Sequence, residues 1–206
     1  MTNKMDEMVA VIPRDLVAGM PFPGFVSTAA SLFDLHVLMQ QVKYKRRGDV
    51  EEDERWLQVI PYMYVWDPDV EKVFVYRRST KSGEKRLHRK LSLGLGGHLN
   101  EEDGRHGRVS LLGTGARREL NEELCFDPPI DVQGLTLTTV GALLLDTTPV
   151  DRVHLGVVMR VSYGGNVTPN GDEVIDYFWS DPDHLDELDM EGWSEAIVAH
   201  LQKLKK

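Results

Sequence analysis

Three glutamates crowd one short stretch of this chain. Glu119, Glu122 and Glu123 lie within ARRELNEEL, the sequence from Ala116 to Leu124. On a helix they stand at i, i+3 and i+4, so their carboxylates share one face. Each like-charged pair at this spacing costs roughly 0.2 to 0.5 kcal/mol. A hard divalent cation such as Mg²⁺, bound among the oxygens, would reverse that cost. The alternative is a solvated acidic face that the neighbouring arginines partly neutralise.

A glycine pair lies upstream of these acids. Gly96 and Gly97 follow the strand-like residues LSLGL directly, and there the backbone can turn sharply and offer a carbonyl or an amide to a metal or a phosphate. A strand, a glycine turn, a loop and an acidic helix together predict a compact metal-phosphate site. Beside the acidic face, the helix carries an apolar i, i+4 stripe that we expect to be buried, namely Leu112, Ala116, Leu120 and Leu124.

The rest of the pattern predicts an α/β fold that positions this site. Residues 1–55 are expected to form an N-terminal extension of strand and helix that packs on a main domain of residues 56–206. An amphipathic helix over 191–206 closes the chain. Runs rich in β-branched and aromatic residues predict strands at 56–66, 71–78, 91–95, 135–146, 152–163 and 172–180, the first two joined by a turn at 67–69.

The composition of the chain disfavours several classes of function. The formal net charge of −9 disfavours binding to a nucleic-acid polymer or to an anionic membrane. No apolar run approaches the roughly 20 residues that span a bilayer. The single cysteine, Cys125, cannot form an intrachain disulfide, which favours a cytoplasmic protein, and we expect it to be a small buried core residue.

The motif resembles that of the Nudix hydrolase family, GX5EX7REUXEEXGU, in which U is a bulky aliphatic residue. Residues Arg118 to Glu123 match the REUXEE core in full, and Gly97 and Asp103 keep the GX5E spacing with aspartate in place of glutamate. The order of the surrounding strands is also similar to the family from about residue 57 to residue 188. The resemblance implies a Nudix-like α/β/α sandwich with a mixed β-sheet.

Two positions depart from the family pattern. Residues 104–117 separate Asp103 from Arg118, twice the usual interval, so the loop at 104–110 is predicted to be an insertion and the role of Asp103 stays open. Cys125 stands where the family has glycine, so the helix must end without glycine's freedom at positive φ.

Residue roles follow from the resemblance. It implies that Glu122 and Glu123 ligate Mg²⁺ or Mn²⁺ together with the carbonyl of Gly96. Glu119 would bind a metal or orient the attacking water, and Arg118 would hold a glutamate in place by ion pairing. A further carboxylate from a later strand or loop is common in the family, and Glu173 is the candidate, with an ordinary loop acid as the alternative.

Basic residues before the glycine turn are candidates for binding the substrate. Guanidinium groups pair well with phosphate oxygens, so Arg77, Arg78 and Arg89 are assigned to the substrate's phosphates. His98 follows Gly97 directly and is assigned to a phosphate contact or to proton transfer. The alternative is a solvated loop with no role in catalysis.

The implied reaction is metal-dependent hydrolysis of a phosphoanhydride bond, in a small nucleoside diphosphate linked to another group. The competing hypothesis is a non-catalytic nucleotide sensor or interaction module on the same fold, which the lengthened motif motivates. Dimers are common on this fold, so a homodimer is a further expectation.

Overall fold

The computed structural model describes residues 3–27, 35–79, 89–105, 107–171, 174–185 and 188–204, without the side chains of residues 108 and 109. The chain forms two compact units. Unit 1 comprises residues 1–62, 96–118 and 139–158, and unit 2 comprises residues 63–95, 119–138 and 159–206. Several elements contribute residues to both units, among them the acidic helix.

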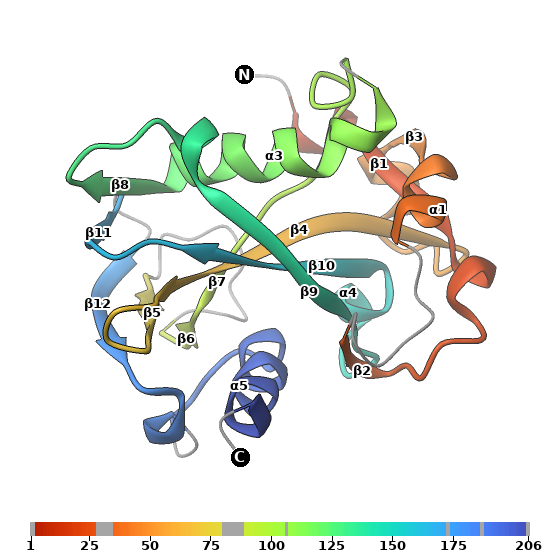
Figure 1. The fold of residues 1–206 in the computed structure, drawn as a ribbon. Helices are drawn as coiled ribbons and strands as arrows, with labels where there is room; N and C mark the ends of the chain where they lie inside the picture. The colour runs from red at the N-terminus through yellow and green to blue at the C-terminus, as the bar shows by residue number, and fades with distance from the viewer. Residues whose placement is uncertain are drawn as a thin grey trace. The chain divides into compact units, whose positions relative to one another are not determined.

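A large mixed sheet of ten strands runs through the fold, and its main path has the order β12-β5-β4-β10-β9-β2 (Figure 1). Helices accompany it, so the α/β fold class predicted from the sequence is confirmed. The predicted hairpin is present, because β4 and β5 pair antiparallel with Trp66 opposite Val73. The strands of the path are β2 (Gly24–Ser27), β4 (Trp56–Asp67), β5 (Lys72–Arg78), β9 (Thr136–Leu144), β10 (His154–Ser162) and β12 (Val174–Ser180).

In unit 1 the N-terminal strand β1 (Met8–Pro13) pairs antiparallel with β3 (Lys43–Arg46) and with the start of β4. Its apolar side chains are buried, with Val9 and Ile12 at 0% exposure. The amide of Ala10 also donates to the carbonyl of Leu99 at 2.8 Å. The first residues of the chain therefore support the loop that follows the glycine pair, while a domain boundary at residue 55 stays a prediction. The short helices of this region are α1 (Leu35–Gln40) and α2 (Arg47–Val50).

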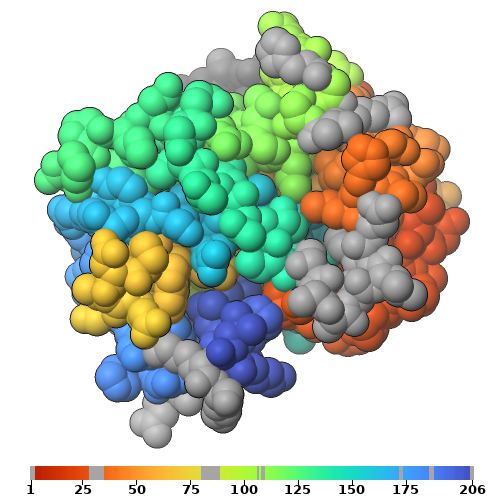
Figure 2. Space-filling view, in the orientation of Figure 1, coloured from red at the N-terminus to blue at the C-terminus, as the bar shows by residue number. Residues whose placement is uncertain are grey.

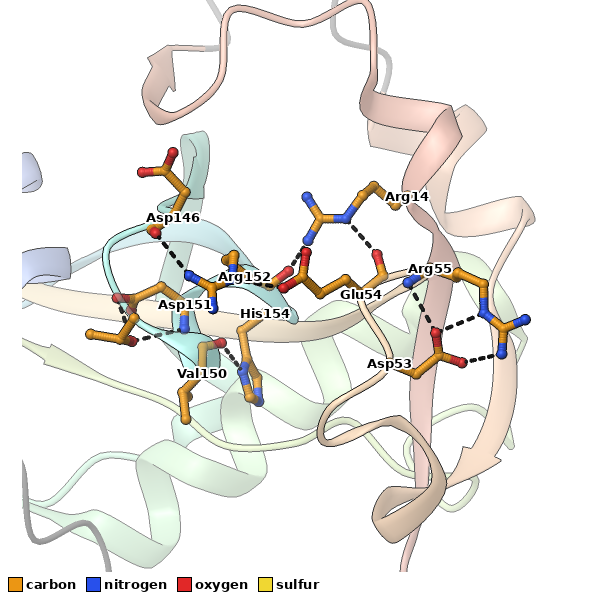
Figure 3. Close-up of polar contacts among 10 residues, drawn as sticks. Arg14, Asp53, Glu54, Arg55, Asp146, Val150, Asp151, Arg152 and His154 are labelled. Atoms are coloured by element: carbon orange, nitrogen blue, oxygen red, sulfur yellow. Dashed lines mark hydrogen bonds and ion pairs between the residues drawn. The ribbon is translucent and has the colours of Figure 1, made fainter.

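Charged contacts join three distant segments of unit 1 (Figure 3). Arg14 Nε donates to the carbonyl of Glu54 at 2.5 Å, and Arg14 Nη2 donates to the carbonyl of Arg152. Arg152 Nε in turn donates to Glu54 Oε1 at 2.7 Å. These bonds tie the end of β1 to the start of β4 and to the short helix α4 (Pro149–Arg152), which precedes β10.

The acidic helix, α3, runs from Arg108 to Glu123. The prediction of an inserted loop over 104–110 is therefore wrong in its last three residues, which are helical. Leu111 and Ala116 are fully buried at 0% exposure, and this apolar face explains why the added residues extend the helix. The lengthened interval consists mostly of extra helical turns ahead of Arg118.

Replacing Gly115 or Gly113 of α3 by alanine is expected to change the free energy of unfolding in opposite directions. A Cβ at Gly115 would overlap Leu99 Cδ2, which is fully buried, and would lie 3.1 Å from Asp103 Oδ2. We therefore expect Gly115→Ala to lower the free energy of unfolding by about 1 to 2 kcal/mol, despite the better helix propensity of alanine. A Cβ at Gly113 would meet only the guanidinium end of Arg117, at 3.3 Å.

The matched variant Gly113→Ala is expected to raise the free energy of unfolding by up to about 1 kcal/mol. Urea unfolding of the two variants beside the wild type measures both changes. Equal signs for the two substitutions would contradict the close contact between α3 and Leu99.

In unit 2 strand β5 pairs antiparallel with β12 and with the short β6 (Leu91–Ser92). The neighbouring β7 (Gly94–Leu95) pairs with β4, and the C-terminal helix α5 covers residues Gly192–Leu204. A parallel bridge joins Leu91 to Met190, just before α5. The core of this unit includes Met63, Val73, Phe74 and Leu91, all at most 2% exposed.

A separate two-stranded sheet in unit 2 was not predicted. Strand β8 (Leu124–Asp127) begins directly after α3 and pairs antiparallel with β11 (Asn166–Pro169). The segments after α3 and around β11 also meet at the molecular surface in Figure 2. Leu124 is buried as predicted, but in a strand and not in the helix. The prediction that Cys125 is buried is wrong, because the alternation of β8 exposes its side chain.

Within the described ranges, no helix combines the length and the apolar character that a membrane crossing requires.

Candidate functional site

Arg118 and Asp103 form a bidentate ion pair in unit 1. Arg118 Nε donates to Asp103 Oδ1 at 3.0 Å, and Arg118 Nη2 donates to Asp103 Oδ2 at 2.9 Å. The same Nη2 also donates to the carbonyl of His98 at 3.0 Å. Asp103 is only 2% exposed, so the pair is poorly screened by solvent. The role of Asp103, which the sequence left open, is to anchor the arginine of the motif.

The loop from Gly96 to Asp103 is held by its own backbone. The amide of Asn100 donates to Asp103 Oδ2, and the amide of Asp103 donates to Asn100 Oδ1, both at 3.1 Å. A Cβ at Gly96 would overlap the carbonyl oxygen of Pro61, so only glycine fits there. The structure therefore explains glycine at position 96 by packing, and its carbonyl as a metal ligand stays a prediction.

The acid face of α3 lies in its last two turns. Glu119 is 7% exposed, Glu123 is half-buried and Glu122 is exposed. Three carboxylates on one helical face form the oxygen donor set that hard divalent cations take. Among the residues that the structure describes, however, no three His, Cys, Asp or Glu side chains gather closely enough to hold a metal. The fourth predicted carboxylate, Glu173, lies outside the described residues.

Polar groups of unit 2 hold the strand that leads toward the glycine pair. The hydroxyls of Tyr76 and Ser92 lie 2.8 and 3.0 Å from the carbonyl oxygen of Gly94. Burial raises the pKa of the Tyr76 phenol, and the negative charges of Glu191 and Glu123 add to this rise. Because Ser92 has one hydroxyl proton, it donates either to the carbonyl of Gly94 or to Glu191 Oε1, which lies 2.5 Å from the hydroxyl oxygen. These hydrogen bonds fix the backbone of β7 at Gly94.

The predicted phosphate-binding arginines gather in unit 2, with different surroundings. Arg77 Nη1 donates to the carbonyl of Arg89 at 2.9 Å, and Arg89 itself is exposed. Arg78 Nε lies 3.8 Å from Glu191 Oε2, and the guanidinium of Arg78 lies over the ring of Tyr76 at 5.5 Å. Because Glu191 already partly neutralises Arg78, Arg77 and Arg89 are the better candidates for a phosphate contact.

His98 is half-buried and forms a chain of hydrogen bonds with the buried Gln58 and His154 in unit 1. Its Nε2 lies 2.8 Å from Gln58 Oε1 and 3.3 Å from His154 Nε2. The ring of His154 is oriented by the carbonyl of Val150, which lies 2.8 Å from Nδ1 (Figure 3). Gln58 Nε2 donates to Glu51, so Gln58 Oε1 accepts, and His98 Nε2 must carry the proton. His98 is therefore a neutral ring whose Nε2 proton is directed toward Gln58 and His154.

The burial of His98 predicts a loss of stability in acid. Burial above all, and then the positive charge of Arg47, lower the pKa of His98 to about 2. An unfolded histidine binds a proton near pH 6.5, so the unfolded state takes up the proton first. The stability is complete above pH 6.5 and is lost as the pH falls toward 2. We expect His98 to account for a loss of about 1.4 kcal/mol between pH 7.5 and pH 5.5.

Urea unfolding at the two pH values measures this loss, with His98→Gln as the comparison. The variant has no imidazole to protonate at this position, so the difference between the two pH values should shrink by about 1.4 kcal/mol. The same difference in both proteins would contradict a neutral, buried His98.

Sequence reasoning left one supporting residue, Asp103, without a role and missed three others. Asp103 had a usable signal, since its GX5E spacing was intact. Gln58 and His154 had none, because they come from distant strands that only the fold brings to His98. The third missed residue is Asn170, whose amides bind the end of α3.

Comparison with known proteins gives relatives over almost the whole chain. Protein YmaB of Bacillus subtilis (strain 168) is 35% identical over 210 residues, which cover 97% of this chain and 100% of YmaB. Among solved structures, Tm1382, a candidate Nudix hydrolase, is 27% identical with a TM-score of 0.73 and covers 96% of this chain and 99% of its own. A scan against models of protein families gave no match.

A more distant structure shares the fold alone. The Nudix domain of Shewanella oneidensis NrtR, solved in complex with ADP ribose, is 10% identical with a TM-score of 0.53. The similarity covers 73% of this chain and 89% of that domain.

Proposed function

Because this chain belongs to the Nudix hydrolase family, we propose that it is a pyrophosphohydrolase, which cleaves a phosphoanhydride bond in a metal-dependent reaction. The proposed substrate is a nucleoside diphosphate linked to another group. One observation carries the proposal above the others. The REUXEE core lies intact on α3, and the lengthened motif still brings Arg118 onto Asp103.

We propose Mg²⁺ or Mn²⁺ as the cofactor, held by Glu119, Glu122 and Glu123. The carbonyl of Gly96 and the carboxylate of Glu173 are the further proposed ligands. When bound, such a cation neutralises charge on phosphoryl oxygens and lowers the pKa of a coordinated water. The chemistry of the donors supports this assignment, because the three described candidates are carboxylates on one helical face and Mg²⁺ needs only one or two carboxylates beside waters and the substrate's phosphates.

Glu119 and Arg118 have different proposed roles in the reaction. Glu119, the most buried of the three glutamates, is proposed to bind a metal or to orient the attacking water and accept its proton. Arg118 does not touch the substrate in this proposal. It fixes the start of the acid face to the loop after the glycine pair, through Asp103 and the carbonyl of His98.

Arg77, Arg78 and Arg89 are the proposed phosphate contacts, with Arg78 the weakest of the three because of Glu191. His98 is proposed to accept a hydrogen bond from a hydroxyl or an amine of the substrate through Nδ1, since Nε2 donates to Gln58. The ADP ribose bound by the NrtR domain supports a nucleotide derivative as the class of substrate. A cytoplasmic location and a homodimer remain predictions.

The test is turnover of a panel of phosphoanhydrides by the purified chain. Nucleotide sugars, ADP-ribose, NADH, dinucleoside polyphosphates and nucleoside triphosphates are incubated with Mg²⁺, with Mn²⁺ or with EDTA in water enriched in ¹⁸O. We expect metal-dependent release of two phosphate-bearing products, or of pyrophosphate, with ¹⁸O in one of them. Tight binding without turnover would favour the sensor hypothesis instead.

A further inference from the structure

The end of α3 lacks the usual means of closing a helix. The last four carbonyls of a helix have no partner within it, and a glycine in the left-handed region commonly supplies one. Here α3 ends at Glu123 and β8 begins at Leu124. Glu71 and Arg89 are the non-glycine residues with positive φ in the described part of the chain, so neither Leu124 nor Cys125 makes such a turn.

The charge of this last turn makes closure harder. Carboxylates at the C-terminal end of a helix oppose the helix dipole, each by roughly 0.3 to 1 kcal/mol at an exposed site. Glu122 and Glu123 occupy that turn, which contains no basic residue. The two proposed metal ligands therefore lie on the part of α3 that is most inclined to fray.

Asn170 closes the helix from another part of unit 2. Its backbone amide donates to the carbonyl of Glu123 at 2.7 Å, and its side-chain Nδ2 donates to the carbonyl of Glu122 at 3.1 Å. The position is fixed by the pairing of β11 with β8, which sets Pro169 opposite Leu124. Gly171 follows with a φ of +90°, so the chain turns away immediately after the cap.

We propose that Asn170 is a positioning residue, which holds the carbonyls of Glu122 and Glu123 and so keeps their carboxylates in place for the divalent cation. The inference deepens the proposed function and rests on it. Asn170 does not itself ligate the metal or touch the substrate. It replaces the missing glycine by donating two hydrogen bonds, and it joins the metal-binding turn to the β8–β11 sheet.

Asn170→Leu tests this role, because leucine keeps the size of the side chain but removes the side-chain donor Nδ2, which binds the carbonyl of Glu122. We expect the dissociation constant for Mn²⁺, measured by electron paramagnetic resonance, to rise about 10- to 100-fold, with a similar fall in kcat and an unchanged KM. Amide hydrogen exchange in residues 119–126 should become faster. Asn166→Leu is the matched control, since Asn166 is an exposed asparagine of β11 and its replacement should change none of these values.

The outcomes separate the two proposals. Unchanged Mn²⁺ affinity and kcat in Asn170→Leu would overturn the positioning role, even if the melting temperature falls. A wild-type protein with no Mn²⁺ binding and no turnover would instead overturn the proposed function, and hydrogen exchange would still show whether Asn170 caps α3. If Asn170→Leu does not fold, Asn170→Ala is held to the same measurements and the same criteria.

Discussion

Replacing Glu123 by glutamine is expected to lower kcat/KM by on the order of 10²-fold or more. Glutamine keeps the size of the side chain but removes the negative charge that the proposed cation requires. The same change should raise the free energy of unfolding by a few tenths of a kcal/mol, because it removes a like charge from Glu119 at i+4 and an unfavourable charge from the helix end. Steady-state kinetics at saturating Mg²⁺ and urea unfolding measure the two effects.

Glu195→Gln is the matched control for this experiment. Glu195 is an exposed glutamate on α5, so its replacement changes the net charge equally without touching the acid face. Its kcat/KM should equal that of the wild type. Full activity in Glu123→Gln would remove Glu123 from the site. Lost activity together with a large loss of stability would mean that the glutamate has a structural role.

The fold could be predicted because its signals are local. The strands of β4, β5, β9, β10 and β12 are runs of β-branched and aromatic residues, and the turn after β4 contains Asp67, whose Oδ1 accepts from the amide of Asp69 at 2.9 Å. The acidic helix follows from its own periodicity. None of these assignments needs a residue from elsewhere in the chain.

The parts that could not be predicted depend on distant contacts. Cys125 looked like a core residue from its type, but its burial is decided by the pairing of β8 with β11. Leu124 continues the helical stripe in sequence, yet the cap by Asn170 ends the helix one residue earlier. No local sequence pattern predicts the hydrogen bond between Asn170 and Glu122, which lie 48 positions apart.

The sequence predicts the residues that would carry out the chemistry of the site, but not the residues that hold them in place. The residue types and spacing in the REUXEE core predict which acids bind the metal, whichever fold surrounds them. Which groups hold those acids depends on tertiary geometry, as with Asp103. The 14 residues between Asp103 and Arg118 left the role of Asp103 open, because a flexible loop of that length would not fix the two side chains relative to each other. In the structure most of those residues belong to α3, which holds Arg118 at Asp103.

Arg118→Met is expected to lower the free energy of unfolding by about 3 to 5 kcal/mol. The substitution leaves Asp103 with a 3% exposed carboxylate and without its bidentate partner. Burying an unpaired charge costs far more than the loss of a solvated pair. Urea unfolding at pH 7.5 measures the change.

Arg105→Met separates this effect from the general loss of an arginine. Arg105 pairs with Glu102 at i−3, and the two side chains are 69% and 63% exposed. Solvent screens such a pair, so its loss should change the free energy of unfolding by less than about 1 kcal/mol. Similar losses in the two variants would mean that Asp103 is not buried in solution and that the lengthened motif does not hold Arg118. A large loss in Arg118→Met alone would show that the extra turns of α3 preserve the anchor on which the acid face depends.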